Sequence, residues 1–96
     1  MPKYIGLTSW TDEGIKHVKD SPTRLDQARQ LAKSEGATLE QFFMVTGEHD
    51  MVVVIDAPDD ATLARFLLKL ARGGAVRTRT MRAFTEEEYR AIVSAG

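Results

Sequence analysis

The 96-residue chain is 43% hydrophobic and 28% charged, which is the composition of one globular domain. Thirteen basic and 14 acidic residues leave a net charge of −1, so there is no general electrostatic case for binding nucleic acid or an anionic membrane. No apolar run approaches the roughly 18–20 residues of a membrane span, and the absence of cysteine excludes disulfides and thiol nucleophiles. We therefore expect a single soluble, cytoplasmic domain over residues 1–96, with no nucleic acid or membrane partner.

The first part of the chain predicts a strand and then a helix in two segments. Residues 3–10 favour a strand, and Thr11 is expected to cap a short helix. Ser21 is expected to cap a second helical segment that has Pro22 at its first position and ends at Gly36. The apolar residues that recur there at helical spacing are Leu25, Ala28, Leu31 and Ala32.

The middle of the chain predicts two strands and a second helix. Residues 38–47 form the second strand, a turn follows at 47–50, and residues 51–55 are an unbroken apolar run typical of a strand buried on both sides. Asp59 is expected to cap the next helix, which ends at Gly73. Its apolar positions follow a clear i, i+3, i+4, i+7 pattern: Leu63, Phe66, Leu67 and Leu70.

The end of the chain predicts a fourth strand over residues 75–84 and a terminal helix. Arg77 and Arg79 share one face of this strand with Met81. Thr85 and Glu88 have the spacing of a capping box, and the short helix that follows has one apolar face.

The predicted order β-α-β-β-α-β, followed by a terminal helix, indicates an α+β fold of the ferredoxin-like class. Right-handed crossovers place both main helices on one face of a four-stranded antiparallel sheet, with the strand order 4-1-3-2. The third strand is then central, and its second apolar face has no helix left to cover it. We therefore expect a homodimer or higher homo-oligomer in which the sheets of two subunits face each other.

Several stretches of the chain resemble the GYD domain family of bacteria and archaea. The central one runs from Gly47-Glu48-His49-Asp50 through residues 51–60, and the others are residues 14–22, 76–78 and 82–88. The resemblance implies a dimeric α/β-barrel assembly within a superfamily that also holds cofactor-free monooxygenases, dismutases and ligand-sensing regulatory domains. It implies no established activity. His49 stands where the tyrosine of the Gly-Tyr-Asp element would be, so a role of that phenol does not carry over to this chain.

The two histidines are the first candidates for chemistry. His17 lies among lysines on a helix, and we interpret it as part of a solvated face. His49 lies between Glu48 and Asp50, and an imidazole beside a carboxylate can act as a general base or a metal ligand. The alternative, which we favour, is a polar turn in which Asp50 accepts hydrogen bonds from backbone amides. No spacing of metal ligands is present, so no metal and no cofactor are predicted.

Arg77 and Arg79 allow two interpretations. Facing a cavity, the two guanidinium groups would bind a carboxylate or phosphate. Facing outward, they would protect the free edge of the sheet from pairing with other strands, which is the interpretation we favour.

Tyr4, Thr8 and Trp10 share one face of the first strand. Hydroxyls beside aromatic rings suit a pocket for a small organic ligand, and they equally suit a dry subunit interface. The leading hypothesis is a small oligomeric domain that binds such a ligand in a sheet-lined or intersubunit cavity. The alternatives are a cofactor-independent monooxygenase with His49 as its base, and a scaffolding oligomer without a ligand; whether the chain is an enzyme stays open.

Overall fold

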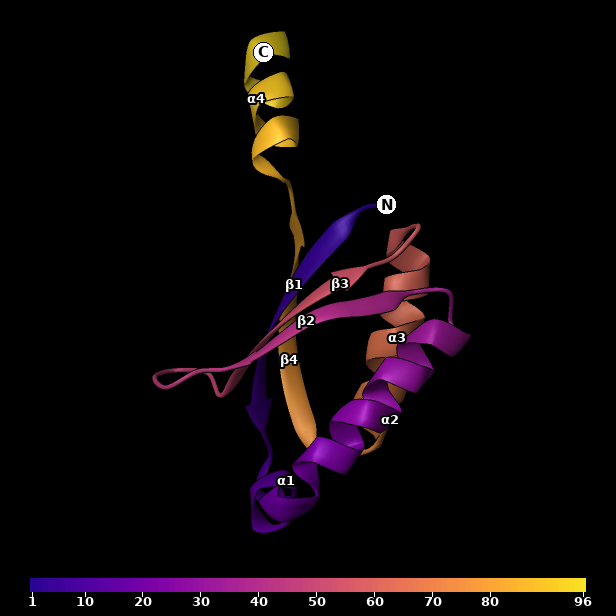
Figure 1. Ribbon diagram of the computed structural model, residues 1–96, viewed down its shortest axis with the longest axis vertical. Coiled ribbons are helices and arrows are strands. Elements are labelled where there is room, and N and C mark those ends of the chain that lie inside the picture. Colours follow the sequence, from indigo (N-terminus) through magenta and orange to yellow (C-terminus); the bar gives the residue numbers. More distant parts are fainter.

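The computed structural model describes all 96 residues, and it places the elements in two layers with a separate terminal helix (Figure 1). A four-stranded sheet forms one layer, and two long helices form the other. The elements in chain order are β1 (Lys3–Trp10), α1 (Asp12–Lys16), a 3₁₀ turn (Val18–Asp20), α2 (Ser21–Ser34), β2 (Thr38–Met44), β3 (Met51–Asp56), α3 (Asp60–Arg72), β4 (Val76–Ala83) and α4 (Glu86–Ala95). No helix is long and apolar enough to cross a bilayer.

The sheet has the strand order β2-β3-β1-β4, with every neighbouring pair antiparallel. This confirms the predicted order and the ferredoxin-like α+β fold. The strands β1 and β3 are central, whereas β2 and β4 are the two edges. Both α2 and α3 lie on the same side of the sheet, as Figure 1 shows, so its other side has no helical cover.

The alternation of side chains along β1 sorts the residues between these two sides. Tyr4, Gly6 and Thr8 are buried under the helices, whereas Ile5 and Leu7 lie on the side without helices. The predicted division of this strand into two faces is therefore correct. Tyr4, Thr8 and Trp10 consequently belong to the face that the helices cover and not to a surface that faces another subunit.

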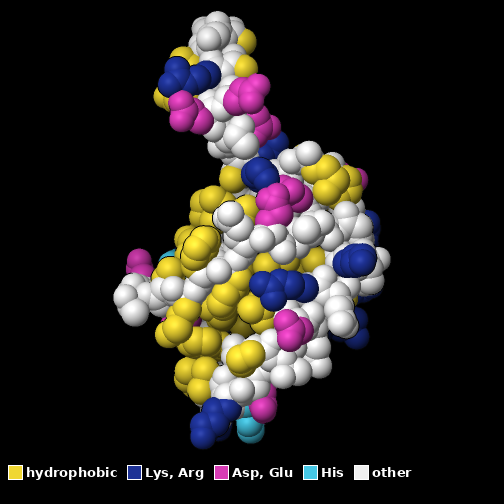
Figure 2. Space-filling view, in the orientation of Figure 1, with side chains coloured by type: hydrophobic (Ala, Val, Ile, Leu, Met, Phe, Trp, Pro, Cys, Tyr) yellow, Lys and Arg dark blue, Asp and Glu magenta, His cyan; other side chains and the backbone are white.

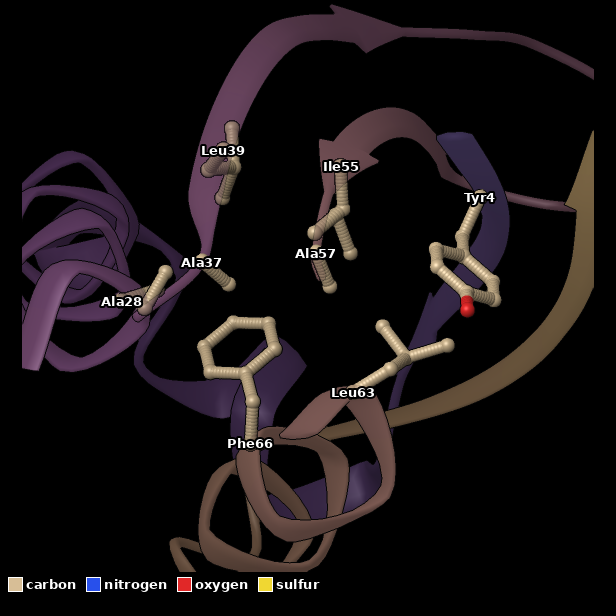
Figure 3. Packing of buried hydrophobic residues seen from close by; sticks show 9 residues of the cluster. Tyr4, Ala28, Ala37, Leu39, Ile55, Ala57, Leu63 and Phe66 are labelled. Carbon is tan, nitrogen blue, oxygen red and sulfur yellow. The ribbon is translucent and has the colours of Figure 1, made fainter. Parts of the chain in front are cut away.

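The hydrophobic core is small and lies at the Tyr4 end of β1 (Figure 3). Phe66 of α3 and Ile55 of β3 are its largest fully buried side chains. Small residues complete it from α2 and the strand ends, among them Ala28 and Ala57. This packing fixes α2 and α3 to the sheet at one end.

Several predicted boundaries differ from the structure by a few residues. Strand β2 ends at Met44 and not at residue 47, because the chain leaves the ladder for a hairpin loop in which Gly47 has a φ of +133°. Strand β4 is one residue shorter at each end than predicted. Ser21 was expected to cap α2 but is its first residue. The preceding 3₁₀ turn leads straight into the helix, and Asp20 occupies the cap position without a side-chain hydrogen bond.

The other predicted caps are confirmed. Thr11 accepts a hydrogen bond from the Gly14 amide, and Asp59 accepts one from the Thr62 amide. At α4, the Thr85 hydroxyl accepts from the Glu88 amide while the Glu88 carboxylate accepts from the Thr85 amide. The starts of α1, α3 and α4 are therefore set by residues that the sequence identifies.

We predict that Gly14→Ala destabilises the domain. A Cβ at position 14 would lie 1.9 Å from the carbonyl oxygen of Ala75, so α1 and the segment before β4 would have to move apart. Overpacking of this kind typically costs about 1–3 kcal/mol of unfolding free energy, which urea denaturation measures. Gly73→Ala is the matched control, because its Cβ would meet no atom closer than 3.3 Å. Equal stability of the two variants would contradict the prediction.

Candidate functional site

An apolar pocket of about 320 Å³ opens between α2, α3 and the sheet, next to the core and toward the Trp10 end of β1. Its walls are mainly aliphatic. Leu25, Ala28 and Leu31 line it from α2, and Leu67 and Leu70 line it from α3. It lies where the two helices do not fill the space over the strands, which makes it a ready-formed site for an apolar molecule.

A few polar groups face this pocket from the sheet. Thr8 is 6% exposed, and its hydroxyl donates a long hydrogen bond of 3.4 Å to the Thr78 hydroxyl. Thr78 also lies 3.0 Å from the Thr80 hydroxyl. Trp10 lines the same end of the pocket. These neutral groups can orient one hydroxyl, carbonyl or amide of a bound molecule.

The two cationic side chains of the pocket have partners within the chain. Arg24 donates to the carbonyl oxygens of His17 at 2.9 Å and Gly14 at 3.2 Å, which ties α2 to α1. Lys69 forms an ion pair with Glu35. The pocket therefore offers neutral hydrogen-bonding groups rather than a free charge.

Tyr4 lies on the same face of β1 but in the core, not in the pocket (Figure 3). Its hydroxyl donates a hydrogen bond to the Asp60 carboxylate at the start of α3. This hydrogen bond, together with burial and the negative charge of Asp60, raises the pKa of the Tyr4 phenol. The Arg82 guanidinium lies 5.8 Å from the ring centroid on the other side. Tyr4 thus joins β1 to α3.

Asp50 fixes the β2–β3 hairpin to the end of β1. Its carboxylate accepts a hydrogen bond of 3.0 Å from the Trp10 amide, and its own amide donates one of 3.0 Å to the Thr8 carbonyl. The carboxylate therefore positions the strand segment that carries two pocket residues.

His49 is half-buried and makes no hydrogen bond or ion pair with a carboxylate of the chain. It does not line the pocket. The exposed His17 lies 3.1 Å from Glu13 on α1. No group of three or more His, Cys, Asp or Glu side chains lies close enough together to hold a metal ion.

Arg77 and Arg79 are exposed on β4, on the side of the sheet that lacks helices. They line a second, open depression of about 900 Å³ along this edge strand, which we call the β4 groove. His49 of the hairpin, Leu7 of β1 and Leu68 of α3 line the same groove. The predicted site residues are thus divided. Thr8 and Trp10 lie in the pocket, whereas His49, Arg77 and Arg79 lie in the β4 groove.

Thr78 and the α2 wall of the pocket were not among the predicted site residues. The alternation in β4 placed Thr78 on one face with Val76 and Thr80. Only the register of the sheet, in which Thr8 pairs with Thr78, shows that their hydroxyls meet. The one hint of the pocket in the sequence is the small side chain of Ala28 on the apolar face of α2, which leaves space beside that helix.

The fold and the pocket define a ferredoxin-like α+β domain with a ready-formed site between its helices and its sheet. The family model described as GYD domain matches residues 4–93, and the chain belongs to this family. A curated relative from Thermus thermophilus, the glutamine synthetase and cystathionine beta-lyase binding protein, is 37% identical over 84 residues. The match covers 86% of this chain and 88% of the relative.

Solved structures of bacterial regulators share the fold. The feast or famine regulatory protein of Mycobacterium tuberculosis, complexed with L-methionine, superposes with a TM-score of 0.67 at 19% identity, covering 88% of this chain and 51% of that one. The leucine response regulatory protein of the same organism gives a TM-score of 0.64 at 22% identity, with the same two coverages. The chain therefore spans about half the length of these regulators.

Tyr4→Phe should change how stability depends on alkaline pH. Because the folded phenol has a raised pKa, its contribution is fully present below the unfolded value of about 10 and is lost as pH rises through the folded pKa. The variant should therefore lose less unfolding free energy than the wild type between about pH 9 and pH 11. Urea unfolding followed by circular dichroism measures this, with Tyr89→Phe on the exposed α4 as the control. Parallel pH profiles for wild type and Tyr4→Phe would contradict it.

The neighbours His49 and Asp50 should differ in their effect on stability. Asp50→Ala leaves the half-buried Trp10 amide without its acceptor and should cost about 1–2 kcal/mol of unfolding free energy. His49→Ala removes no hydrogen bond and should change it by no more than about 0.5 kcal/mol. Denaturant titrations of both variants measure the difference. A larger loss for His49→Ala would show that the imidazole has a structural partner.

Proposed function

We propose that this protein is a self-associating binding module that holds a small, largely apolar molecule in the pocket between α2, α3 and the sheet. The pocket itself carries the proposal. Its volume of about 320 Å³ lies within the usual range for small-molecule sites, roughly 300–1,000 Å³, and its walls are apolar with a few polar groups at one end. A ligand with one hydrogen-bonding group would place that group beside Thr8, Thr78 and Trp10.

The relatives support a regulatory role for such binding. One structural neighbour is a regulatory protein complexed with L-methionine, a small molecule with an apolar side chain. At 19% identity that likeness concerns the fold, so L-methionine enters here as one probe and not as the assigned ligand.

The uncovered side of the sheet supports self-association. Its centre is apolar, with Ile5 and Leu7 on β1 and Val52 and Val54 on β3. The accessible surface of the chain is 6577 Å², about 1,100 Å² more than the ~5,500 Å² expected for a compact monomer of 10.7 kDa. A facing subunit would remove this excess from water.

A second candidate function is binding to metabolic enzymes, which the name of the 37% identical Thermus relative favours. Titration calorimetry with purified glutamine synthetase and cystathionine beta-lyase, from the organism that encodes this chain, tests it. Binding of either enzyme would support the second function, and absence of heat with both would count against it.

Trp10 is the only tryptophan and lines the pocket, so its fluorescence reports on occupancy. We expect 1-octanol to shift the emission saturably and to bind more tightly than octanoate of equal chain length, because the cationic side chains are already paired. L-methionine is the third probe. Ala28→Leu, which extends into the pocket, should weaken binding of octanol about tenfold.

Ala64→Leu on the exposed side of α3 is the matched control and should bind octanol as the wild type does. Thr8→Val should weaken octanol binding about fivefold, since it removes a hydroxyl while keeping the shape. No saturable shift with any of the three probes, or an unchanged affinity in Ala28→Leu, would overturn the proposed site.

A further inference from the structure

Helix α4 projects from the body of the protein and packs against no other helix or strand (Figures 1 and 2). It nevertheless has an apolar stripe. Tyr89 is 59% exposed, Ile92 is 52% exposed and Val93 is 60% exposed. Residues at these spacings share one face of a helix. A helix of this length is marginal alone in water, so the stripe requires a surface to pack against.

The direction of α4 is fixed where it leaves the sheet. The capping box of Thr85 and Glu88 holds its first turn, and the Glu88 carboxylate lies 3.8 Å from the Arg82 guanidinium of β4. The same guanidinium lies 4.4 Å from the centroid of the Phe84 ring. These contacts direct α4 along the line of β4 and away from its own sheet, so its stripe has to be covered by another chain.

The dimensions of the chain agree with a projecting arm. The radius of gyration is 14.3 Å, compared with about 12.5 Å for a compact domain of this length. The excess accessible surface of about 1,100 Å² per chain exceeds the ~800 Å² that each partner buries in an interface of standard size. A single interface somewhat larger than the standard size would therefore cover this excess.

Complementary charges indicate that the partner is a second copy of this chain. The first turn of α4 carries Glu86, which pairs with Arg90 of the same helix, and Glu87, which forms no ion pair. The β4 groove carries Arg77 and Arg79 without an ion pair, and Glu48 is its one acidic residue. Within one chain these groups cannot meet, because the strand rises about 3.3 Å per residue and α4 leaves its far end. A twofold axis across the strands would bring the α4 of one copy to the arginine end of the other.

We propose that α4 is an exchanged arm that each chain packs into the β4 groove of a second copy. The apolar stripe lies on Leu7 and Leu68, the latter 67% exposed, and the acidic first turn lies near Arg77 and Arg79. The contact is isologous, so each chain gives one arm and receives one. The exchanged arm rests on the proposed self-association, in which α4 is the segment that holds the two chains together.

Sedimentation velocity over a concentration series tests the arm in the full-length chain. Ile92→Asp places a charge in the stripe and should raise the dimer dissociation constant at least tenfold. Ala91→Asp adds the same residue to the opposite face of the same helix and should change the constant less than twofold. If the protein is a dimer and wild type, Ile92→Asp and Ala91→Asp have equal dissociation constants, the proposed role of α4 is wrong and the proposed self-association stands. A monomeric wild type would overturn both.

A charge exchange tests the location of the contact. Replacing Glu86 and Glu87 by lysine, or Arg77 and Arg79 by glutamate, should weaken the dimer about tenfold in low salt. The chain that carries all four substitutions should recover most of the wild-type affinity, since the ion pairs are restored with reversed sign. Additive weakening in the combined variant would show that α4 does not reach the β4 groove. Circular dichroism confirms that each variant is folded.

Discussion

The structure depends on a sheet with two apolar faces and helices for only one of them. Strand β3 is apolar on both sides, and β1 alternates Tyr4 and Thr8 under the helices with Ile5 and Leu7 on the other side. In a two-layer domain of this size, both helices are needed to bury one face. The other face and the terminal helix are then exposed surfaces, and the proposed self-association would cover them.

The pocket follows from how the helix layer is packed. Ala28 and Ala32 are small core residues that let α2 lie close to the sheet, where the core is filled. Toward Trp10, no side chain of α2 or α3 fills the space between them and the strands, and the pocket opens there. The hydrogen bonds of Asp50 to the Trp10 end of β1 and those of Arg24 to α1 fix its boundary. The core therefore forms the inner wall of the site, and these polar contacts hold its rim.

The elements could be predicted because their signals are local, and the strand order follows from their succession and from the handedness of the crossovers. Periodicity, Thr11 and Asp59 as caps, and the capping box at Thr85 each lie within a few residues of the element they define. The site could be predicted only in part. Tyr4, Thr8 and Trp10 share a face by alternation, but whether each lies in the core or the pocket depends on α3 and on the register with β4. His49 and Arg77 line the same groove because the β2–β3 hairpin brings His49 to β4. Their separation in the sequence gives no sign of this long-range placement.

Strand β4 separates the pocket from the groove by a single backbone. Its alternation directs Thr78 toward the helices, where it lines the pocket and also the rim of the groove, whereas Arg77 and Arg79 line the groove alone. A one-residue change in register would exchange them and would place the arginines under the helices. The pairing of β4 with β1 therefore maintains both surfaces at once. Side-chain substitutions that keep this ladder are the ones that can distinguish ligand binding from association.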